Sequence, residues 1–159
     1  MISRPAEIWL VKNHFGYLEY GTPVNRTILQ KTFYLIQSLG VDFRYIFYGY
    51  LKGPYSPALA KDAYDAFNDP VSYKEEVNQY RLSGRVMNLF EKYKKNVGDK
   101  FQEPNWLELL SSLRFLKNNF PDKDWKGVKE ILYADKPFWK ERDGLVDEAI
   151  QHPLLIALT

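Results

Sequence analysis

The chain has 159 residues, of which 45% are hydrophobic, 26% charged and 16% aromatic, and its formal net charge is +2. This length suits one compact domain over residues 1–159, and the absence of cysteine excludes disulfides, thiolate metal sites and a cysteine nucleophile. The net charge is too small to indicate a nucleic-acid or membrane partner. No apolar run is long enough to span a bilayer and no signal-peptide segment opens the sequence, so we expect a cytoplasmic protein without membrane contact.

The first two predicted helices occupy residues 3–18 and 25–39. Ser3 is placed to cap the first helix and Asn25 to cap the second, while Gly40 is placed to end the second in the left-handed conformation. The second helix carries a wide apolar stripe, so we expect it to be largely buried. The stripe comprises Ile28, Leu29, Phe33, Leu35, Ile36 and Leu39.

A strand is predicted over residues 43–50, FRYIFYGY, because nearly all of them are aromatic or β-branched. Side chains of both parities are apolar, which is typical of a strand covered on both faces. Gly53 and Pro54 break this pattern, and we expect Gly53 to adopt a conformation that a β-carbon would disfavour. Ser56 followed by Pro57 is an N-cap with proline at the first helical position, which predicts a helix to Phe67.

The string LQKTFYLIQ (29–37), then FYGYLKGPYS (47–56), then Leu59 and Asp62, resembles the YwgA-like family of prokaryotic proteins and, more distantly, the Panacea antitoxin family. LELLSSLRFLKNNF (107–120), with Lys136 and Ala149 downstream, is similar to the helical second half of YwgA-like proteins. The resemblance implies a winged-helix-like core with a helical extension and no known catalytic residue. On the Panacea side alone it implies neutralisation of a partner protein.

A β-hairpin is predicted after Asn68-Asp69-Pro70, which is a helix stop. Residues 71–75 and 79–83 each alternate with period two around a turn at Asn78. A hairpin in this place is typical of the wing of a winged helix, in which 56–67 would be the recognition helix. We therefore predict a mainly helical α+β fold: a winged-helix-like half (1–82) with a small antiparallel sheet, and a helical half (83–159).

The helical half is predicted from caps and apolar spacing. Ser83 caps a helix that ends at Val97 before Gly98, and Asn105 with Glu108 resembles a capping box that opens the next helix, which stops before Pro121. Asp124 caps a short helix through Leu132. A last helix spans 138–151, and Pro153 separates an apolar tail, LLIAL (154–158).

The sequence predicts no catalytic residue, no cofactor and no metal site. His14 and His152 are the only histidines, and their spacing matches no metal signature. No carboxylate sits in an apolar run that would raise its pKa, although Glu7 and Asp42 come closest. The glycines fall at helix ends and turns, so no phosphate-binding loop is indicated.

Basic residues cluster where a winged helix would meet DNA. Lys74 and Arg81 share the outward parity of the predicted hairpin, and Arg85, Lys92 and Lys95 follow on the next helix. Together they could neutralise several phosphates. The predicted recognition helix argues against this use, because its exposed face also carries Asp62 and Asp65, which phosphate would repel.

Tyr48, Tyr50, Lys52 and Tyr55 have two interpretations. They could fill the core, which is the preferred interpretation, or form a cationic aromatic patch that grips a peptide or stacks on bases. Lys31 either extends its ammonium to the surface or pairs with an acidic residue such as Asp62.

These observations favour non-catalytic recognition of a macromolecule, with an antitoxin-like or adaptor-like protein partner ahead of DNA. The candidate protein-binding residues are Tyr48, Tyr50, Lys52, Tyr55, Asp62 and Asp65. The alternatives are a DNA-binding winged-helix regulator, which would use Lys74, Arg81, Arg85, Lys92 and Lys95, and an enzyme of unrecognised class. The sequence leaves the oligomeric state open, a homodimer included.

Overall fold

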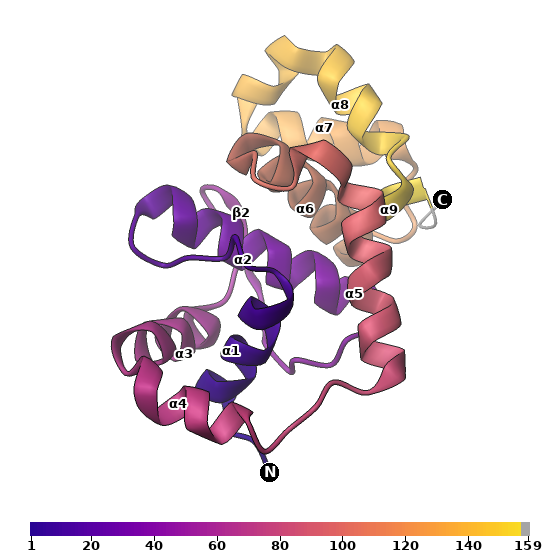
Figure 1. The fold of residues 1–159 in the computed structure, drawn as a ribbon. Coiled ribbons are helices and arrows are strands. Elements are labelled where there is room, and N and C mark those ends of the chain that lie inside the picture. Colours follow the sequence, from indigo (N-terminus) through magenta and orange to yellow (C-terminus); the bar gives the residue numbers. More distant parts are fainter. Residues whose placement is uncertain (157–159) are drawn as a thin grey trace.

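The structure is a computed structural model and describes residues 1–156. It is mainly helical with one two-stranded antiparallel sheet in that range, which confirms the predicted α+β class (Figure 1). The elements are α1 (Arg4–His14), α2 (Pro23–Ser38), β1 (Tyr48–Tyr50), β2 (Gly53–Tyr55), α3 (Pro57–Asn68), α4 (Pro70–Val77), α5 (Gly84–Val97), η1 (Gly98–Lys100), α6 (Pro104–Asn119), α7 (Trp125–Asp135), η2 (Pro137–Arg142), α8 (Asp143–Ile150) and α9 (Pro153–Ile156).

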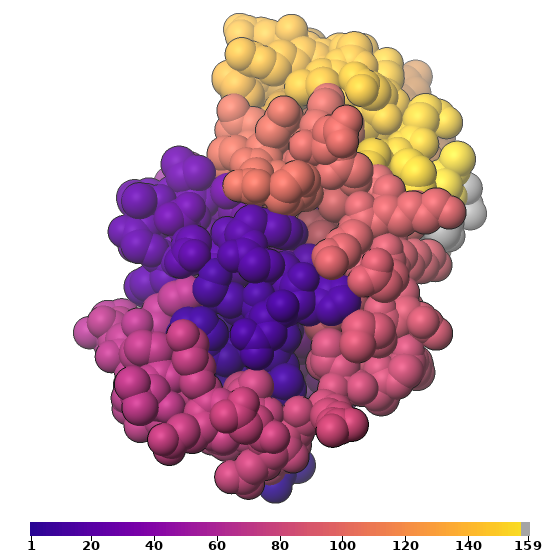
Figure 2. All heavy atoms as spheres, in the orientation of Figure 1, coloured from indigo at the N-terminus to yellow at the C-terminus, as the bar shows by residue number. Residues whose placement is uncertain are grey.

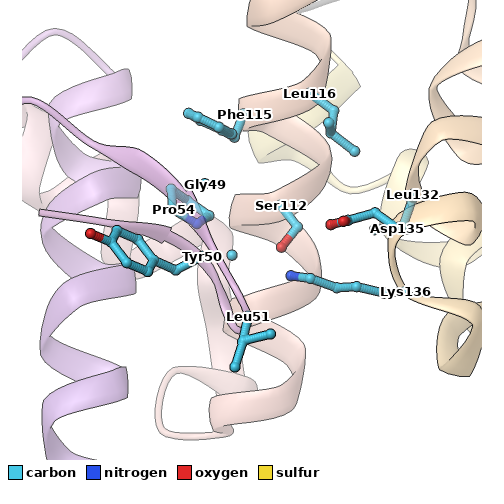
Figure 3. A pocket seen from close by; sticks show the side chains of 11 residues that line it. Gly49, Tyr50, Leu51, Pro54, Ser112, Phe115, Leu116, Leu132, Asp135 and Lys136 are labelled. Carbon is cyan, nitrogen blue, oxygen red and sulfur yellow. The ribbon is translucent and has the colours of Figure 1, made fainter.

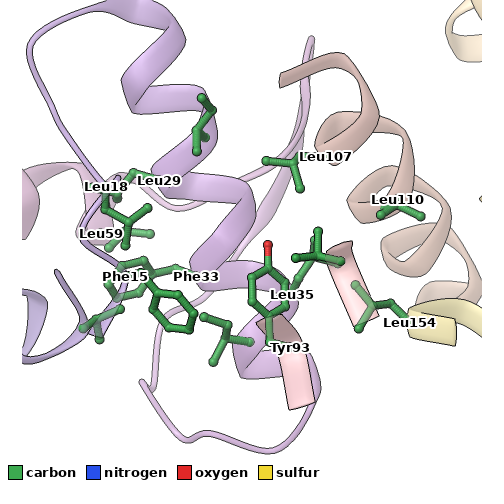
Figure 4. Close-up of a cluster of buried hydrophobic side chains, with 14 of the residues drawn as sticks. Phe15, Leu18, Leu29, Phe33, Leu35, Leu59, Tyr93, Leu107, Leu110 and Leu154 are labelled. Carbon is green, nitrogen blue, oxygen red and sulfur yellow. The ribbon is translucent and has the colours of Figure 1, made fainter. Parts of the chain in front are cut away.

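Helix α2 lies at the centre of the fold and is buried along most of its length, as its apolar stripe predicts. It packs against α6, β2, α5 and α3, while α1 packs against α3 and α4. In Figure 2 the indigo N-terminal residues accordingly lie between the magenta residues of α3 and α4 and the orange residues of α6. The core therefore runs through both parts of the chain, and Figure 4 shows Phe33 of α2, Tyr93 of α5 and Leu107 of α6 within it.

Most of the predicted helix caps are present. The side chains of Ser3, Ser56, Ser83 and Asp124 each accept a hydrogen bond from a backbone N–H in the first turn of their helices. Gly40 follows α2 with the positive φ that was predicted, and Gly98 ends α5 as predicted and also has a positive φ.

Several helix boundaries were predicted wrongly. Helix α1 ends at His14 and not at Leu18, and α7 continues to Asp135, beyond Leu132. Helix α2 begins at Pro23 with Thr22 as its cap, so Asn25 lies inside the helix. Helix α6 begins at Pro104 without a side-chain cap, because proline already holds the dihedral of the first turn. The predicted last helix over 138–151 divides into η2 and α8.

The predicted wing is wrong, because residues 71–75 and 79–83 form no hairpin. Pro70 starts helix α4, which runs to Val77 and packs against α1. The alternation over a few residues also fits a short helix, and here the buried position is Val77 while Val71 is exposed. Residues 1–82 therefore lack the hairpin that the winged-helix prediction required.

The predicted strand over 43–50 is also corrected. Val41, Phe43 and Tyr45 are buried while Ile46 is exposed, so this segment is covered on one face only. Pairing begins at Tyr48, which lies opposite Tyr55, and the turn falls at Leu51 and Lys52, before Gly53 and Pro54. Before β1, at Tyr45, a side chain and not a strand satisfies the backbone. The Gln37 amide donates to the carbonyl oxygen of Tyr45 and accepts from its N–H.

Candidate functional site

The two most distinctive strings of the sequence contact each other: LQK lies in α2, and GPYS covers β2 and the α3 cap. The Gln30 side chain donates to the carbonyl oxygen of Ser56 at 2.9 Å and accepts from its N–H at 2.9 Å. The next residue, Lys31, donates from Nζ to the carbonyl oxygen of Pro54 at 2.7 Å. Both strings therefore have a structural role, because α2 satisfies buried backbone groups of β2 and of the α3 cap.

Lys31 is buried, so neither interpretation of its side chain from the sequence holds. Its ammonium does not reach the surface, and Asp62 instead accepts a hydrogen bond from the Tyr45 hydroxyl at 2.9 Å. Burial lowers the pKa of Lys31 to about 8, although Glu108 attracts the ammonium and opposes the shift. The neighbouring charges of Lys136 and Lys52 lower this pKa further.

The β1–β2 hairpin exposes apolar and aromatic side chains, which overturns the preferred prediction that they fill the core. Tyr48 and Tyr50 are 53% and 52% exposed, and Leu51 at the turn is 92% exposed. The Tyr50 and Tyr55 rings meet edge to face, with centroids 5.0 Å apart. We call this area the hairpin surface; it comprises Ile46, Tyr48, Tyr50, Leu51, Lys52 and Tyr55.

A groove lies on each side of the hairpin. The first, of about 490 Å³, is lined by the hairpin, α6 and α7 and is called the α6–α7 groove (Figure 3). It is lined by Gly49, Tyr50, Leu51, Gly53, Pro54, Ser112, Phe115, Leu116, Leu132, Asp135 and Lys136. The second, of about 520 Å³, lies against α2 and includes Arg26, Lys31 and Lys52. Tyr50 and Leu51 line both grooves, so the hairpin surface continues into each of them.

Polar groups converge in the α6–α7 groove. In Figure 3 the Ser112 hydroxyl, the Lys136 ammonium and the Asp135 carboxylate point toward the same part of it. Ser112 is only 4% exposed, and its hydroxyl has no hydrogen-bond partner within residues 1–156. Burial lowers the pKa of Lys136, against the attraction of Glu108 and Asp135.

The acidic members of the predicted protein-binding set lie apart from the tyrosines, on α3. Asp62 accepts the Tyr45 hydroxyl, and Asp65 pairs with Lys61 at 3.0 Å. Both carboxylates are therefore already engaged within the chain. The structure groups Tyr48, Tyr50, Lys52 and Tyr55 and leaves Asp62 and Asp65 outside that group.

The predicted DNA-binding residues divide as well. Without the wing, Lys74 lies on α4 with its ammonium 4.5 Å from the Trp9 ring centroid. Arg81 lies exposed in the segment between α4 and α5. Arg85, Lys92 and Lys95 are exposed on α5 at a spacing that places them on one helical face. Arg85 also donates to the carbonyl oxygen of Gly40 at 3.1 Å.

Residues 1–156 contain no group of three or more metal-ligating side chains, and none of the helices there is long and apolar enough to cross a membrane. The His152 ring accepts the backbone N–H of Leu154, and the His14 ring lies beside Glu91. Burial raises the pKa of Glu7, the carboxylate that the sequence singled out with Asp42. Arg44 and Arg4 oppose this shift by attracting the ionised form.

Comparisons of the chain with protein-family models, with curated proteins and with solved structures give no match.

Proposed function

We propose that this protein is a non-catalytic recognition protein that binds a protein partner through the hairpin surface. The observation that carries the proposal is the exposure of Tyr48, Tyr50 and Leu51 on a short hairpin that stands between two grooves. Exposed clusters of this kind are typical of interaction sites, because leaving such apolar area in water is unfavourable. Tyrosine suits this use, since its ring is apolar and rigid while its hydroxyl stays hydrated.

The charges around the hairpin indicate what kind of partner segment fits. Lys52 is exposed at the turn, Arg26 is exposed beside the groove on the α2 side, and Lys136 lines the other groove. Glu108 and Asp135 offset only part of this positive charge. The complementary partner therefore presents apolar side chains to the tyrosines and acidic groups to the lysines.

The architecture of the hairpin favours an extended segment as the bound element. Strand β1 is exposed along its length, whereas Gly53 and Pro54 of β2 are buried against α2 and α6. The sheet has two strands, so β1 has a neighbour on one side only. An extended chain can lie along such an exposed strand and place alternate side chains toward it.

Duplex DNA is the second candidate partner, and the basic face of α5 is the observation that favours it. Arg85, Lys92 and Lys95 would be its phosphate contacts. This face is narrow, and Arg85 is partly engaged by Gly40. We rank it below the hairpin surface because Lys74 and Arg81 do not join it on α5.

Site-specific photo-crosslinking in the source cells tests the proposal. A photoreactive amino acid replaces Leu51 in one variant and, as a matched exposed apolar control, Val71 of α4 in another. We expect one discrete protein of different sequence to attach at position 51 and not at position 71. Identical products from both positions, a second copy of this chain, or nucleic acid alone at position 51 would overturn the proposal.

A further inference from the structure

The Ser112 hydroxyl is a buried polar group without a partner in residues 1–156, and it faces the α6–α7 groove. Its neighbour Ser111 behaves differently, because the Ser111 hydroxyl donates to the carbonyl oxygen of Leu107 at 2.7 Å. A buried hydroxyl that gives up water without finding another partner is costly. Ser112 therefore keeps an unused donor at the wall of the groove, and because its oxygen is covered, donation to a group in the groove requires the side chain to turn outward.

Lys136 supplies a second donor in the same place. It is half-buried directly after α7 and extends into the groove toward Ser112 (Figure 3). Within residues 1–156 it forms no ion pair and no side-chain hydrogen bond, and burial disfavours its charge, as the lowered pKa indicates. An anion in the groove would give this ammonium a close counter-charge.

The hairpin backbone packs closely against the Ser112 hydroxyl. A β-carbon at Gly53 would lie 2.5 Å from the Ser112 oxygen, so any other residue there would displace the hydroxyl. Around these donors the walls are apolar and include Leu51, Phe115 and Leu132. A small anionic head on an aliphatic stem matches this lining.

We propose that the α6–α7 groove binds a carboxylate of the partner's peptide chain, held by the Ser112 hydroxyl and the Lys136 ammonium. This inference rests on the proposed function and assigns an acidic anchor to the bound segment. A carboxylate fits better than a phosphate, because the carboxylates of Asp135 and Glu108 lie near the same ammonium and would repel a second negative charge. The carboxylate comes from an acidic side chain or from a C-terminus.

Nuclear magnetic resonance titration of the isotope-labelled full chain tests this site without the partner. The probes are N-acetylglycine for a C-terminal carboxylate, N-acetyl-aspartic acid amide for a side-chain carboxylate, inorganic phosphate, and N-acetylglycinamide as the neutral control. We expect at least one carboxylate probe to shift the signals of Gly53, Ser112 and Lys136 saturably, and the neutral amide to leave them unchanged. The stronger of the two carboxylate probes identifies the source.

Matched variants distinguish loss of the binding site from loss of the fold. Ser112→Ala and Lys136→Gln should each lower the affinity for the carboxylate probe at least ~10-fold, as expected for loss of a charge-assisted donor. The controls are Ser111→Ala, at the adjacent serine, and Lys140→Gln, at an exposed lysine of η2. Their affinity for the carboxylate probe should stay within about twofold of the wild-type value. Circular dichroism and backbone spectra confirm that each variant is folded.

Two outcomes would overturn the carboxylate assignment. One is the absence of saturable shifts at these residues with either carboxylate probe, and the other is phosphate binding as tightly as carboxylate. Either result would still allow crosslinking at position 51, because Tyr50 and Leu51 also line the groove on the α2 side and are exposed at the hairpin. A failed site and a failed proposed function are thus distinguishable.

Discussion

Lys31 Nζ donates to the carbonyl oxygen of Pro54 at 2.7 Å, so a buried ammonium on α2 holds the strand that carries the hairpin. Glu108 is the acidic group that opposes the lowering of its pKa to about 8. Below that pH Lys31 is charged in both the folded and the unfolded chain, and the cost of burying the charge is fully present. Between pH 8 and the unfolded pKa of 10.5 the folded chain has lost this proton while the unfolded chain keeps it.

Because the unfolded state binds more protons in this window, stability must rise with pH there. We expect the free energy of unfolding of the wild type, relative to Lys31→Met, to increase by roughly 2 kcal/mol from pH 7 to pH 9.5. Urea titrations of both proteins across this range measure it, and tyrosine ionisation cancels in the difference. A difference that is flat with pH would show that Lys31 titrates normally.

The cap at Ser56 gives a second prediction. The Ser56 hydroxyl accepts the N–H of Leu59 at 3.1 Å, and the residue is fully buried. Ser56→Ala should lower the free energy of unfolding by about 1 kcal/mol, because a helix N–H loses its acceptor. Ser38→Ala is the control, since its hydroxyl donates to the Tyr34 carbonyl near the end of α2 and caps no N–H. An unchanged denaturant midpoint for Ser56→Ala would rule out the cap.

The hairpin contains two glycines that should respond differently to alanine. Gly53 has a φ of +88°, and its β-carbon would meet the Ser112 oxygen at 2.5 Å, whereas the nearest atom to a β-carbon at Gly49 is a Phe115 carbon at 3.5 Å. We expect Gly53→Ala to cost about 1–2 kcal/mol or more and Gly49→Ala to be near neutral. Thermal unfolding compares them, and equal losses would contradict the geometry of β2.

The basic face of α5 gives a prediction about nucleic acid. We expect duplex DNA to bind weakly and without sequence preference, because Lys92 and Lys95 alone lack the partners that a wing would add. Fluorescence anisotropy at several salt concentrations measures this, with Lys92→Gln as the test and Lys126→Gln, on α7, as the control. Nanomolar binding to one duplex at physiological salt, lost on Lys92→Gln, would instead establish the second candidate function.

The sequence predicted the elements whose signals are local. The caps at Ser3, Ser56, Ser83 and Asp124 were found because a side chain and a nearby N–H lie within one turn. The wing was misread because two short alternating runs fit a strand as well as a helix, and packing of α4 on α1 decides between them. Exposure of the hairpin was missed for a similar reason, since aromatic content alone does not say which face is covered.

The α6–α7 groove could not be predicted because its residues are distant in the chain. Gly53, Ser112 and Lys136 come together only when the hairpin, α6 and α7 pack. The one signal in the sequence was the polar pair Ser111 and Ser112 within a leucine-rich helix, yet only one of these serines faces the groove. The reciprocal contact of Gln30 with Ser56 was equally hidden, although both residues lie in strings that the sequence singled out.

The central claim is that the hairpin surface binds a protein, and calorimetric titration of the partner captured at position 51 tests it most directly. The wild type is compared with Tyr48→Ser/Tyr50→Ser and with Lys92→Gln/Lys95→Gln, all of which change exposed side chains. Loss of the two tyrosines should weaken binding on the order of 30-fold, because aromatic anchors dominate interface energies. The affinity of the α5 variant for the partner should stay within about threefold of the wild-type value. The reverse pattern, with the tyrosines dispensable and the α5 lysines essential, would contradict the account.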